Sequence, residues 1–367
     1  MASLTVKPIL GCNMGCTGCY EGEIFRRNGN KPEPYSLERI IARILSDKAD
    51  TITLHGGEIT LMPVSDLEVL CQAIVDAGRR INMQTNGSLI TPGLLELLVK
   101  HHVHVGVSIN GPAELNRDRR AVPHTSKIPE EIMLKATDKM TERIHNNIYK
   151  LLDAGVTVGI ITVLSQTNAG DTEKVQKLVQ WGLELEAKGV HTHRWNLLHQ
   201  DFDVPKIELT PDEALFAYQW LTNVTFENAT RSWWPFRGMY RNLAGATPED
   251  CWFAPCDPYA TAAVRSVFHD GSMGNCLRTA KDGIPYLRAE DGEQHYRQEL
   301  LAAIPMEEGG CGGCKYWKIC YGACPAEAVD SDWRNKTRFC KVFYGTYDYL
   351  TQRRQAFDPN WQPSITK

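Results

Sequence analysis

Three cysteines near the start of the chain constrain its fold more than any other feature. Cys12, Cys16 and Cys19 stand within eight residues of one another, so one loop must gather all three thiols. Thiolates at this CxxxCxxC spacing can hold three corners of a four-iron, four-sulfur cluster and leave the fourth iron without a protein ligand. A zinc site with its fourth ligand elsewhere in the chain is the alternative. Because an open iron can bind a small molecule and pass it an electron, the motif predicts a reactive cluster.

Strand and helix patterns alternate through the first 200 residues. Strands are predicted over residues 4–10, 51–54, 81–85, 103–109, 156–164 and 191–197. Helices are predicted over residues 36–46, 64–77, 92–100, 140–154 and 172–188. This repetition implies right-handed parallel crossovers and a curved, partly closed α/β barrel. The three cysteines follow the first strand, which suits a site at the C-terminal edge of a parallel sheet.

Two motifs together resemble a known family. Tyr20 directly follows the third cysteine, and His55-Gly-Gly-Glu58 ends the second predicted strand. This combination resembles the radical S-adenosylmethionine (SAM) superfamily. The resemblance implies a partial (β/α)6 TIM-like barrel and catalysis at the cluster of Cys12, Cys16 and Cys19. It also implies that the open iron binds SAM, whose reductive cleavage gives a 5′-deoxyadenosyl radical that abstracts hydrogen from a substrate.

The resemblance further implies a set of SAM-binding residues. The methionine amino group is assigned to Gly56, Gly57 and Glu58, the carboxylate to Ser108 and Arg120, and a ribose hydroxyl to Asn110. Thr85 and Asn86 are predicted to line the pocket, Tyr20 to pack by the cluster or adenine, and the backbone of Leu198 to contact adenine. Turn capping is the alternative role for Ser108 and Asn110.

A second cysteine array lies near the C-terminus, where eight of the 12 cysteines fall between Cys251 and Cys340. Zinc ribbons are the alternative, but the whole order, with Gly271 before the third cysteine, resembles the SPASM domain of radical SAM enzymes that mature peptides and proteins. The resemblance assigns one auxiliary cluster to Cys251, Cys256, Cys276 and Cys324, and the other to Cys311, Cys314, Cys320 and Cys340. Three 4Fe-4S clusters are therefore predicted. Cys71 is left over and is predicted to be buried and inert.

The predicted organisation has four parts. Residues 1–200 form the radical SAM partial barrel, 201–245 a helical bridge, 246–345 the SPASM domain and 346–367 a C-terminal tail. A net charge of −4 and a pI near 6.3 argue against a nucleic-acid surface. The sequence shows neither a signal peptide nor an apolar run long enough for a membrane span, so a cytoplasmic protein is expected. In that compartment the cysteines favour metal ligation over disulfides.

The predicted reaction is modification of a ribosomally made peptide by cross-linking, epimerisation or a related C–H change. Only 11 residues precede Cys12, so leader recognition is expected to require a separate leader-recognition protein or another surface of this one. Leu277 stands where sulfatase-maturing relatives carry a proposed general-base aspartate, which disfavours formylglycine formation. The alternatives are a dehydrogenase or epimerase of a small molecule, and a non-enzymatic iron–sulfur electron carrier or zinc-stabilised scaffold. A flavodoxin or ferredoxin is the expected reductant.

Two further patterns have structural alternatives. Arginines and aromatic residues interleave over residues 231–241 and can grip a peptide through cation–π contacts or simply pack two modules together. The histidines at positions 101, 102, 104, 191 and 193 resemble metal-binding tracts. Alternation along a strand sends neighbouring side chains to opposite faces, so no ligand role is assigned to them.

Overall fold

The computed structural model describes residues 3–22, 33–123, 126–200, 206–228, 232–247, 251–257, 264–280 and 296–366. Parts of the predicted bridge (201–205 and 229–231) and of the predicted SPASM domain (248–250, 258–263 and 281–295) lie outside the described residues. The chain forms two compact units. The first comprises Met1–Glu208 and Val264–Leu277, and the second comprises Leu209–Ala263 and Arg278–Lys367.

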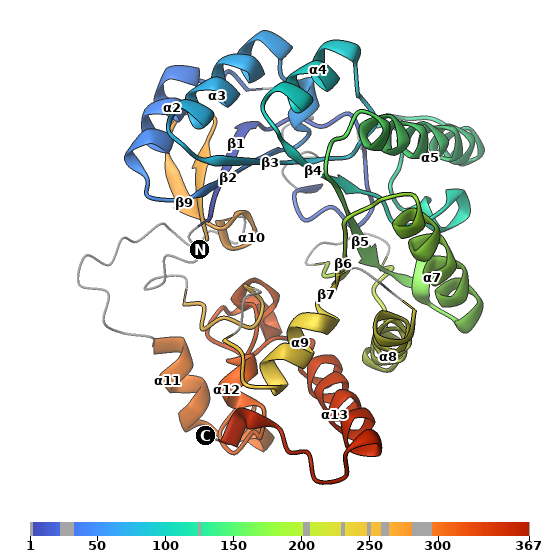
Figure 1. The fold of residues 1–367 in the computed structure, drawn as a ribbon, viewed down its shortest axis with the longest axis vertical. Helices are drawn as coiled ribbons and strands as arrows, with labels where there is room; N and C mark the ends of the chain where they lie inside the picture. The colour runs from blue at the N-terminus through green and yellow to red at the C-terminus, as the bar shows by residue number, and fades with distance from the viewer. Residues whose placement is uncertain are drawn as a thin grey trace. The chain divides into compact units, whose positions relative to one another are not determined.

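A curved, mostly parallel sheet forms the centre of the first unit (Figure 1). Its strands are β1 (Ser3–Ile9), β2 (Thr51–Gly56), β3 (Arg80–Thr85), β4 (His104–Ser108), β5 (Val158–Leu164), β6 (Thr192–Leu197), β8 (Val264–Phe268) and β9 (Met273–Asn275). Within this unit their order is β6-β5-β4-β3-β2-β1-β8-β9, and β9 alone among them runs antiparallel to its neighbour. The six predicted strands are all present, with ends that differ by at most two residues. The predicted α/β partial barrel is confirmed.

Helices cover one face of this sheet (Figure 1). They are α2 (Leu37–Ser46), α3 (Val64–Asp76), α4 (Pro92–Lys100), α5 (Glu130–Asp153), α6 (Gln166–Ala169) and α7 (Thr172–Ala187), with short 3-10 turns η1 (Ile59–Leu61) and η2 (Ala113–Asn116). Side chains of Ser36, Thr91 and Asp171 cap three of them by accepting an amide hydrogen bond. Helix α5 begins ten residues earlier than predicted, at Glu130. Its first turns are largely exposed, although Met133 and Thr137 are buried, and the acidic residues there favour a helix start.

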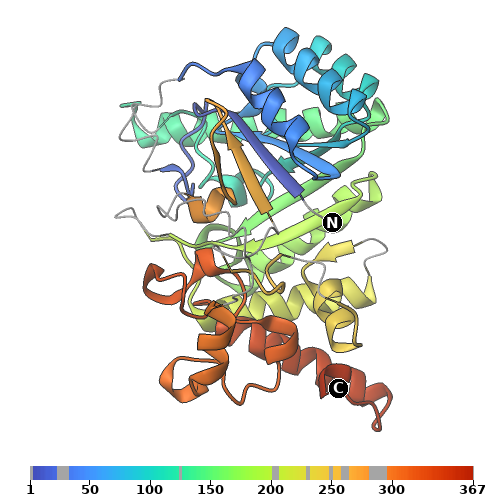
Figure 2. The same ribbon diagram turned by 90° about the vertical axis from the view of Figure 1, so that its left-hand side faces the viewer.

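The strands β8 and β9 were not predicted, and they extend the sheet beyond β1. In Figure 2 they lie beside β1, and β8 pairs with it in parallel from Ser3↔Val264 to Lys7↔Phe268. Gly271 makes the turn between them with φ of +83°, and a Cβ there would lie 2.6 Å from Cβ of Arg39. Residues 264–277 therefore belong to the first unit, although the sequence prediction placed them in the SPASM domain.

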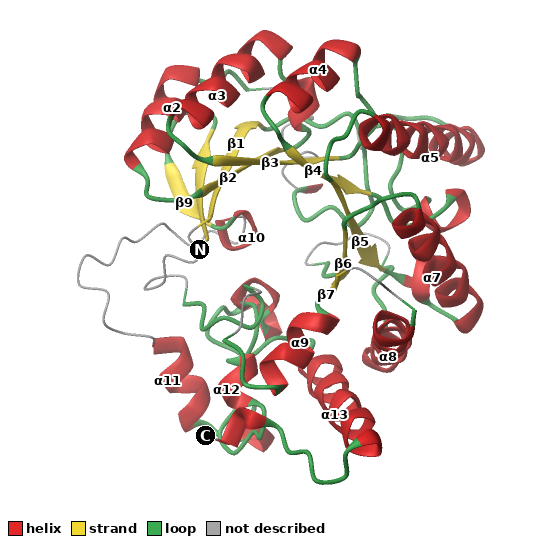
Figure 3. Ribbon diagram, viewed as in Figure 1, coloured by secondary structure: helices red, strands yellow, loops and turns green. Residues whose placement is uncertain are grey.

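The second unit consists mostly of helices and loops (Figure 3). Its elements are α8 (Pro211–Glu227), β7 (Ser232–Trp234), α9 (Phe236–Leu243), α11 (Tyr296–Ala303), η3 (Met306–Glu308), α12 (Trp317–Cys320), η4 (Pro325–Glu327), η5 (Val329–Ser331), α13 (Cys340–Phe357) and η6 (Ser364–Thr366), while α10 (Leu277–Ala280) begins at the end of the first unit. Thr210 and Glu213 form a capping box at the start of α8. Tyr218, Phe236 and Phe343 pack together in its core. Among the described helices, none has the length and apolar character that a bilayer crossing requires.

Candidate functional site

The three N-terminal cysteines lie on a loop that leaves β1 at the C-terminal edge of the parallel sheet. The loop turns tightly, because the amide of Cys19 donates to the Cys16 carbonyl (3.2 Å) and that of Gly22 to the Cys19 carbonyl (2.9 Å). All three cysteines are half-buried. Lys7 of β1 forms a buried ion pair with Glu21 and so ties the end of the loop back to the sheet.

A segment after η2 holds the middle of this loop. The amide of Gly15 donates to the Arg120 carbonyl (3.1 Å), and the amide of Thr17 donates to the Asp118 carbonyl (2.8 Å). The buried Asp118 carboxylate accepts hydrogen bonds from Asn110 Nδ2 (3.0 Å) and Ser165 Oγ (3.1 Å), which anchors the segment beyond the ends of β4 and β5. Burial raises the pKa of Asp118. Cys16 is thus flanked by two fixed amide groups.

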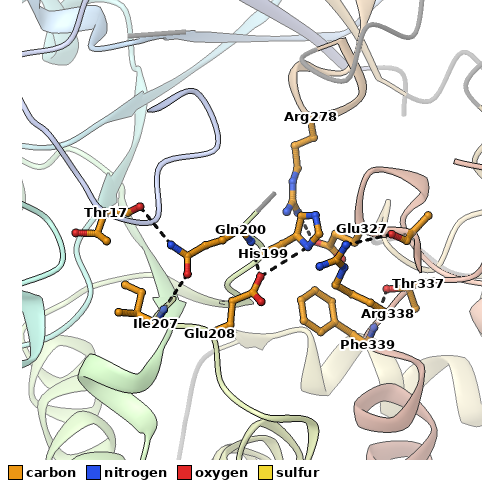
Figure 4. A network of polar contacts seen from close by, with 11 residues as sticks. Thr17, His199, Gln200, Ile207, Glu208, Arg278, Glu327, Thr337, Arg338 and Phe339 are labelled. Atoms are coloured by element: carbon orange, nitrogen blue, oxygen red, sulfur yellow. Dashed lines mark hydrogen bonds and ion pairs between the residues drawn. The ribbon is translucent and has the colours of Figure 1, made fainter. Parts of the chain in front are cut away.

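The segment after β6 supports the loop from another direction (Figure 4). Gln200 Nε2 donates to the Thr17 carbonyl (3.4 Å), while its Oε1 accepts from the amide of Ile207 (2.9 Å). Leu198 lies so close to Gly18 that a Cβ on this glycine would come within 2.6 Å of the leucine Cδ1. Leu198 is therefore placed beside the cysteine loop, and its predicted contact with adenine stays a prediction.

The two glycines of the Gly-Gly-Glu motif allow backbone to pass directly against the cysteine loop. The amide of Gly57 donates to the Ile9 carbonyl, and that of Glu58 donates to the Gly11 carbonyl, both at 2.9 Å. A Cβ on Gly57 would lie 2.3 Å from the Gly11 oxygen, and one on Gly56 would lie 2.7 Å from the Ile9 oxygen. Close packing of two backbone segments therefore requires glycine here.

The Glu58 carboxylate links this motif to the end of β3. It is buried and accepts hydrogen bonds from Thr85 Oγ1 (2.6 Å) and the amide of Asn86 (2.7 Å). Asn86 Nδ2 in turn donates to Asn13 Oδ1 (2.8 Å) and lies 4.0 Å from Cys12 Sγ. The structure therefore brings Glu58, Thr85 and Asn86 together beside Cys12, as predicted for one site, while their contacts with SAM remain predictions.

Ser108 and Asn110 lie at the C-terminal end of β4 and differ in how deeply they are buried. Ser108 is the last residue of the strand and is half-buried. Asn110 is buried, donates to Asp118 and accepts from the amide of Val163 (3.1 Å). Both polar groups of Asn110 thus have partners within the protein, which supports the alternative structural role over the predicted ribose contact.

Two neighbouring arginines occupy different environments. The side chain of Arg120, predicted to bind the SAM carboxylate, forms a partly exposed ion pair with Glu130. Arg119 lies near the cysteines instead, where its charge opposes the rise in the pKa of Cys12 and Cys16 that burial causes. Its Nε is buried and has no hydrogen-bond partner among the described residues. Sequence spacing missed Arg119, because counting from Ser108 cannot tell which of two adjacent turn residues faces the loop.

The three thiols fit an iron–sulfur cluster in their chemistry. Burial raises the pKa of Cys12 to about 12, and the neighbouring Cys16 adds to the shift. Burial likewise raises the pKa values of Cys16 and Cys19, and Cys16 and Cys12 raise that of Cys19 further. Thiols that repel one another as thiolates require a cation to become ligands, and a bound iron–sulfur cluster would supply that positive charge.

A second set of cysteines surrounds a pocket in the second unit. Cys311, Cys314, Cys320 and Cys340 line it together with aromatic residues and Lys336. Burial raises the pKa of Cys311 to about 11, with further increases from Cys340 and Cys314, while Lys336 opposes them. Lys336 Nζ is held by the carbonyl of Gly310 (3.0 Å). The pocket contains the four cysteines that the resemblance assigns to one auxiliary cluster.

The other predicted ligands are less closely defined. Cys251 is exposed, Cys256 and Cys276 are half-buried, and Cys324 is buried. Cys276 belongs to the first unit and the other three to the second, so their grouping stays a prediction. No three His, Cys, Asp or Glu side chains of the described part converge as on a single metal ion. Cysteines of a cluster each bind a different iron and do not need to converge in this way.

Several other candidates have structural roles. Cys71 is fully buried in α3 as predicted, and burial raises its pKa to about 12. His193 stacks on Trp195 with ring centroids 3.7 Å apart, and burial holds its pKa well below the usual range. Trp233 and Phe236, from the stretch that could have gripped a peptide, are buried as well. Their burial supports the packing role.

Comparison with known proteins identifies the first unit. Residues 6–179 match the family model described as the radical SAM superfamily. The serine-type anaerobic sulfatase-maturating enzyme of Bacteroides thetaiotaomicron is 29% identical over 127 residues, which are 31% of this chain and 31% of that enzyme. This match thus spans about a third of the relative's length. The AdoMet-dependent heme synthase of Methanosarcina barkeri is 21% identical, with 90% of this chain and 93% of that enzyme covered.

Solved structures share the fold over most of the chain. Native anSMEcpe with bound AdoMet and Cp18Cys peptide has a TM-score of 0.72 at 19% identity, with coverage of 98% of this chain and 99% of that one. SuiB of Streptococcus suis bound to its precursor peptide SuiA has a TM-score of 0.60 at 17% identity, with coverage of 92% and 75%. These two proteins therefore share the fold of most of this chain.

Proposed function

Because residues 6–179 form a radical SAM domain, we propose that this protein is a radical SAM enzyme that modifies a ribosomally made peptide at a C–H bond. Cys12, Cys16 and Cys19 would hold a 4Fe-4S cluster, which would supply the electron that cleaves SAM to a 5′-deoxyadenosyl radical. One observation carries the proposal: three half-buried thiols share one loop at the edge of the sheet, with Asn86 Nδ2 4.0 Å from Cys12 Sγ. The residues around this loop position and shield it.

The chain's own residues hold the loop in place. Because Gly56 and Gly57 have no side chains, the loop can pack directly against the end of β2. The carbonyls of Asp118 and Arg120 accept hydrogen bonds from the amides of Thr17 and Gly15, respectively. We assign the SAM carboxylate to Arg119 in place of Arg120. A guanidinium whose buried Nε lacks a described partner is suited to receive a carboxylate.

A peptide substrate is the favoured class. The two solved structures that share this architecture are named with bound peptides, Cp18Cys and SuiA. The proposed modification is a cross-link, an epimerisation or a related change. A separate leader-recognition protein and a flavodoxin or ferredoxin reductant complete the proposal, together with two auxiliary clusters on the C-terminal cysteines.

A small-molecule substrate is the second candidate. The relative that aligns over 93% of its own length is named as a heme synthase, whose product is a small molecule. A dehydrogenase or epimerase that acts on a small molecule would need no peptide partner. The two candidates therefore differ in what must be added before SAM cleavage is coupled to product formation.

The experiment uses anaerobically reconstituted protein, dithionite, SAM and the peptide encoded beside its gene. The proposal expects 5′-deoxyadenosine together with a changed peptide mass, or deuterium uptake from D₂O in the case of epimerisation. Formation of 5′-deoxyadenosine with an unchanged peptide and no deuterium uptake would favour the small-molecule candidate. Absence of 5′-deoxyadenosine from iron-loaded protein would leave an electron carrier, and Cys16→Ala provides the matched inactive control.

A further inference from the structure

A fully buried arginine lies at the centre of the cysteine-rich unit. Arg297 of α11 has 0% of its surface exposed, and its guanidinium donates only to backbone carbonyls within the described part of the chain. Nε donates to Trp333 (2.8 Å), and Nη2 donates to Gly322 and Asn335 (both 3.0 Å). Carbonyl groups satisfy the hydrogen-bond donors but do not neutralise the charge.

Burial of a cation is strongly unfavourable unless anions offset its charge. One buried carboxylate lies close, because the amide of Arg297 donates to Asp257 Oδ2 (3.2 Å). The groups that favour the charged form of Arg297 are the thiols of Cys256, Cys324, Cys311 and Cys320, although burial lowers its pKa overall. Two of these cysteines belong to each of the two predicted auxiliary ligand sets. Protonated thiols are neutral, whereas thiolates bound to metal would add negative charge close to Arg297.

Contacts of α11 connect Arg297 to every segment that carries these cysteines. The carbonyls of Tyr321 and Gly322 directly follow Cys320, and Gly322 stands two residues before Cys324. The next residue of the helix, Gln298, donates through Nε2 to the Cys256 carbonyl (3.0 Å). The amide of Cys311 donates to the carbonyl of Leu301 in the same helix (2.7 Å).

We propose that Arg297 is the shared counter-charge of the two auxiliary iron–sulfur clusters and raises the reduction potential of both. The proposal rests on the proposed function only in requiring that both sets of four cysteines bind clusters. A cluster with four thiolate ligands carries net negative charge, and reduction adds another electron. A fixed cation in a low-dielectric interior favours the reduced state. One arginine that donates to the carbonyls of Tyr321 and Gly322, which stand in the chain between Cys320 of one set and Cys324 of the other, therefore acts on both potentials together.

The test isolates the auxiliary clusters by replacing Cys12, Cys16 and Cys19 with alanine. This background protein should hold about eight irons, four for each cluster. Redox titration followed by electron paramagnetic resonance then gives the auxiliary midpoint potentials. Arg297→Gln removes the charge, Arg297→Lys keeps it while losing the planar fork, and Arg334→Gln removes a charge that is 60% exposed at the surface.

The proposal expects Arg297→Gln to shift the one-electron equilibrium at least tenfold toward the oxidised state, which corresponds to about 59 mV. Arg297→Lys and Arg334→Gln should stay within a threefold change. If Arg297→Gln does not retain iron, full iron content in Arg297→Lys would still support a charge effect. The lysine variant loses hydrogen bonds as the glutamine variant does, but it keeps the positive charge. Loss of iron from both variants would assign Arg297 a purely structural role and overturn the proposal.

The controls separate this proposal from the function on which it rests. Unchanged potentials in Arg297→Gln with about eight irons bound would overturn the role of Arg297 and leave the auxiliary clusters intact. A background protein that binds no iron would overturn the auxiliary clusters and the counter-charge together. SAM cleavage by the protein with all its cysteines depends on neither result.

Discussion

Substitution of Gly57 by alanine tests how the cysteine loop is held. The added Cβ would lie 2.3 Å from the Gly11 oxygen, 2.5 Å from the Leu10 oxygen and 2.6 Å from the Gly11 carbonyl carbon. All three atoms are backbone, so no side-chain rotation can relieve the overlap. The loop must move away, and the hydrogen bonds from the amides of Gly57 and Glu58, both at 2.9 Å, must lengthen or break.

The magnitude follows from these contacts. Each lost hydrogen bond costs about 1 kcal/mol, and overpacking of a rigid neighbour adds about 1–3 kcal/mol. Gly57→Ala should therefore lower the free energy of unfolding by about 3–5 kcal/mol. Urea denaturation of the cluster-free protein measures this directly. Iron content after reconstitution should fall by about four per chain, because the displaced loop no longer presents three thiols to one cluster.

Gly93 provides the matched control. It lies inside α4, and the nearest atom to an added Cβ is Val64 Cγ1 at 4.0 Å, an ordinary contact. Gly93→Ala should stabilise the protein by about 0.5–1 kcal/mol, because glycine is a poor helix residue. A Gly57→Ala protein with the stability and iron content of the parent would show that the loop does not depend on the backbone contact, and the reasoning would be refuted.

Three further predictions concern the same unit. Cys16→Ala should abolish 5′-deoxyadenosine formation and remove about four irons per chain; iron analysis and chromatography check both, and retained SAM cleavage would contradict the ligand assignment. Arg119→Gln should weaken SAM binding about 10- to 150-fold, because it removes one charge-assisted hydrogen bond of about 1.5–3 kcal/mol. Arg120→Gln should change the affinity less than about threefold, and equilibrium binding measurements that show the larger loss in Arg120→Gln would contradict the assignment. His145 accepts a hydrogen bond from Trp181 Nε1 (2.8 Å), and burial lowers the pKa of His145. The stability that His145 contributes is therefore present above its pKa in the unfolded chain, about 6.5, and is lost as the pH falls below that pKa. Urea midpoints at about pH 7.5 and 5.5 should therefore differ less in His145→Gln than in the parent, and an equal difference would show that His145 is not responsible.

Hydrophobic periodicity predicted the barrel well, because the strands are short, place apolar residues on a buried face and alternate with helices, three of which begin at a capping side chain. The predicted strands end within two residues of those observed. Residues 264–277 could not be assigned in this way. β8 has only five residues, and it joins the sheet by pairing with β1, more than 250 positions earlier in the chain. A long-range pairing of this kind leaves no local periodic signal.

The sequence predicted the site residues that belong to motifs at strand ends. It did not predict those whose position depends on the conformation of a turn. The cysteines, the two glycines, Glu58, Thr85 and Asn86 meet at one edge of the sheet because strand ends determine their place. The choice between Arg119 and Arg120 depends on local turn geometry, which spacing does not encode. Arg297 gave no sequence signal, since only the fold reveals that it is fully buried.

Electron paramagnetic resonance of the anaerobically reconstituted and reduced protein, with and without SAM, tests the central claim most directly. A cluster on Cys12, Cys16 and Cys19 with one open iron predicts a changed spectrum when SAM is added, and the change should be absent from Cys16→Ala. An identical spectrum with and without SAM, in protein that carries its full iron content, would contradict the account.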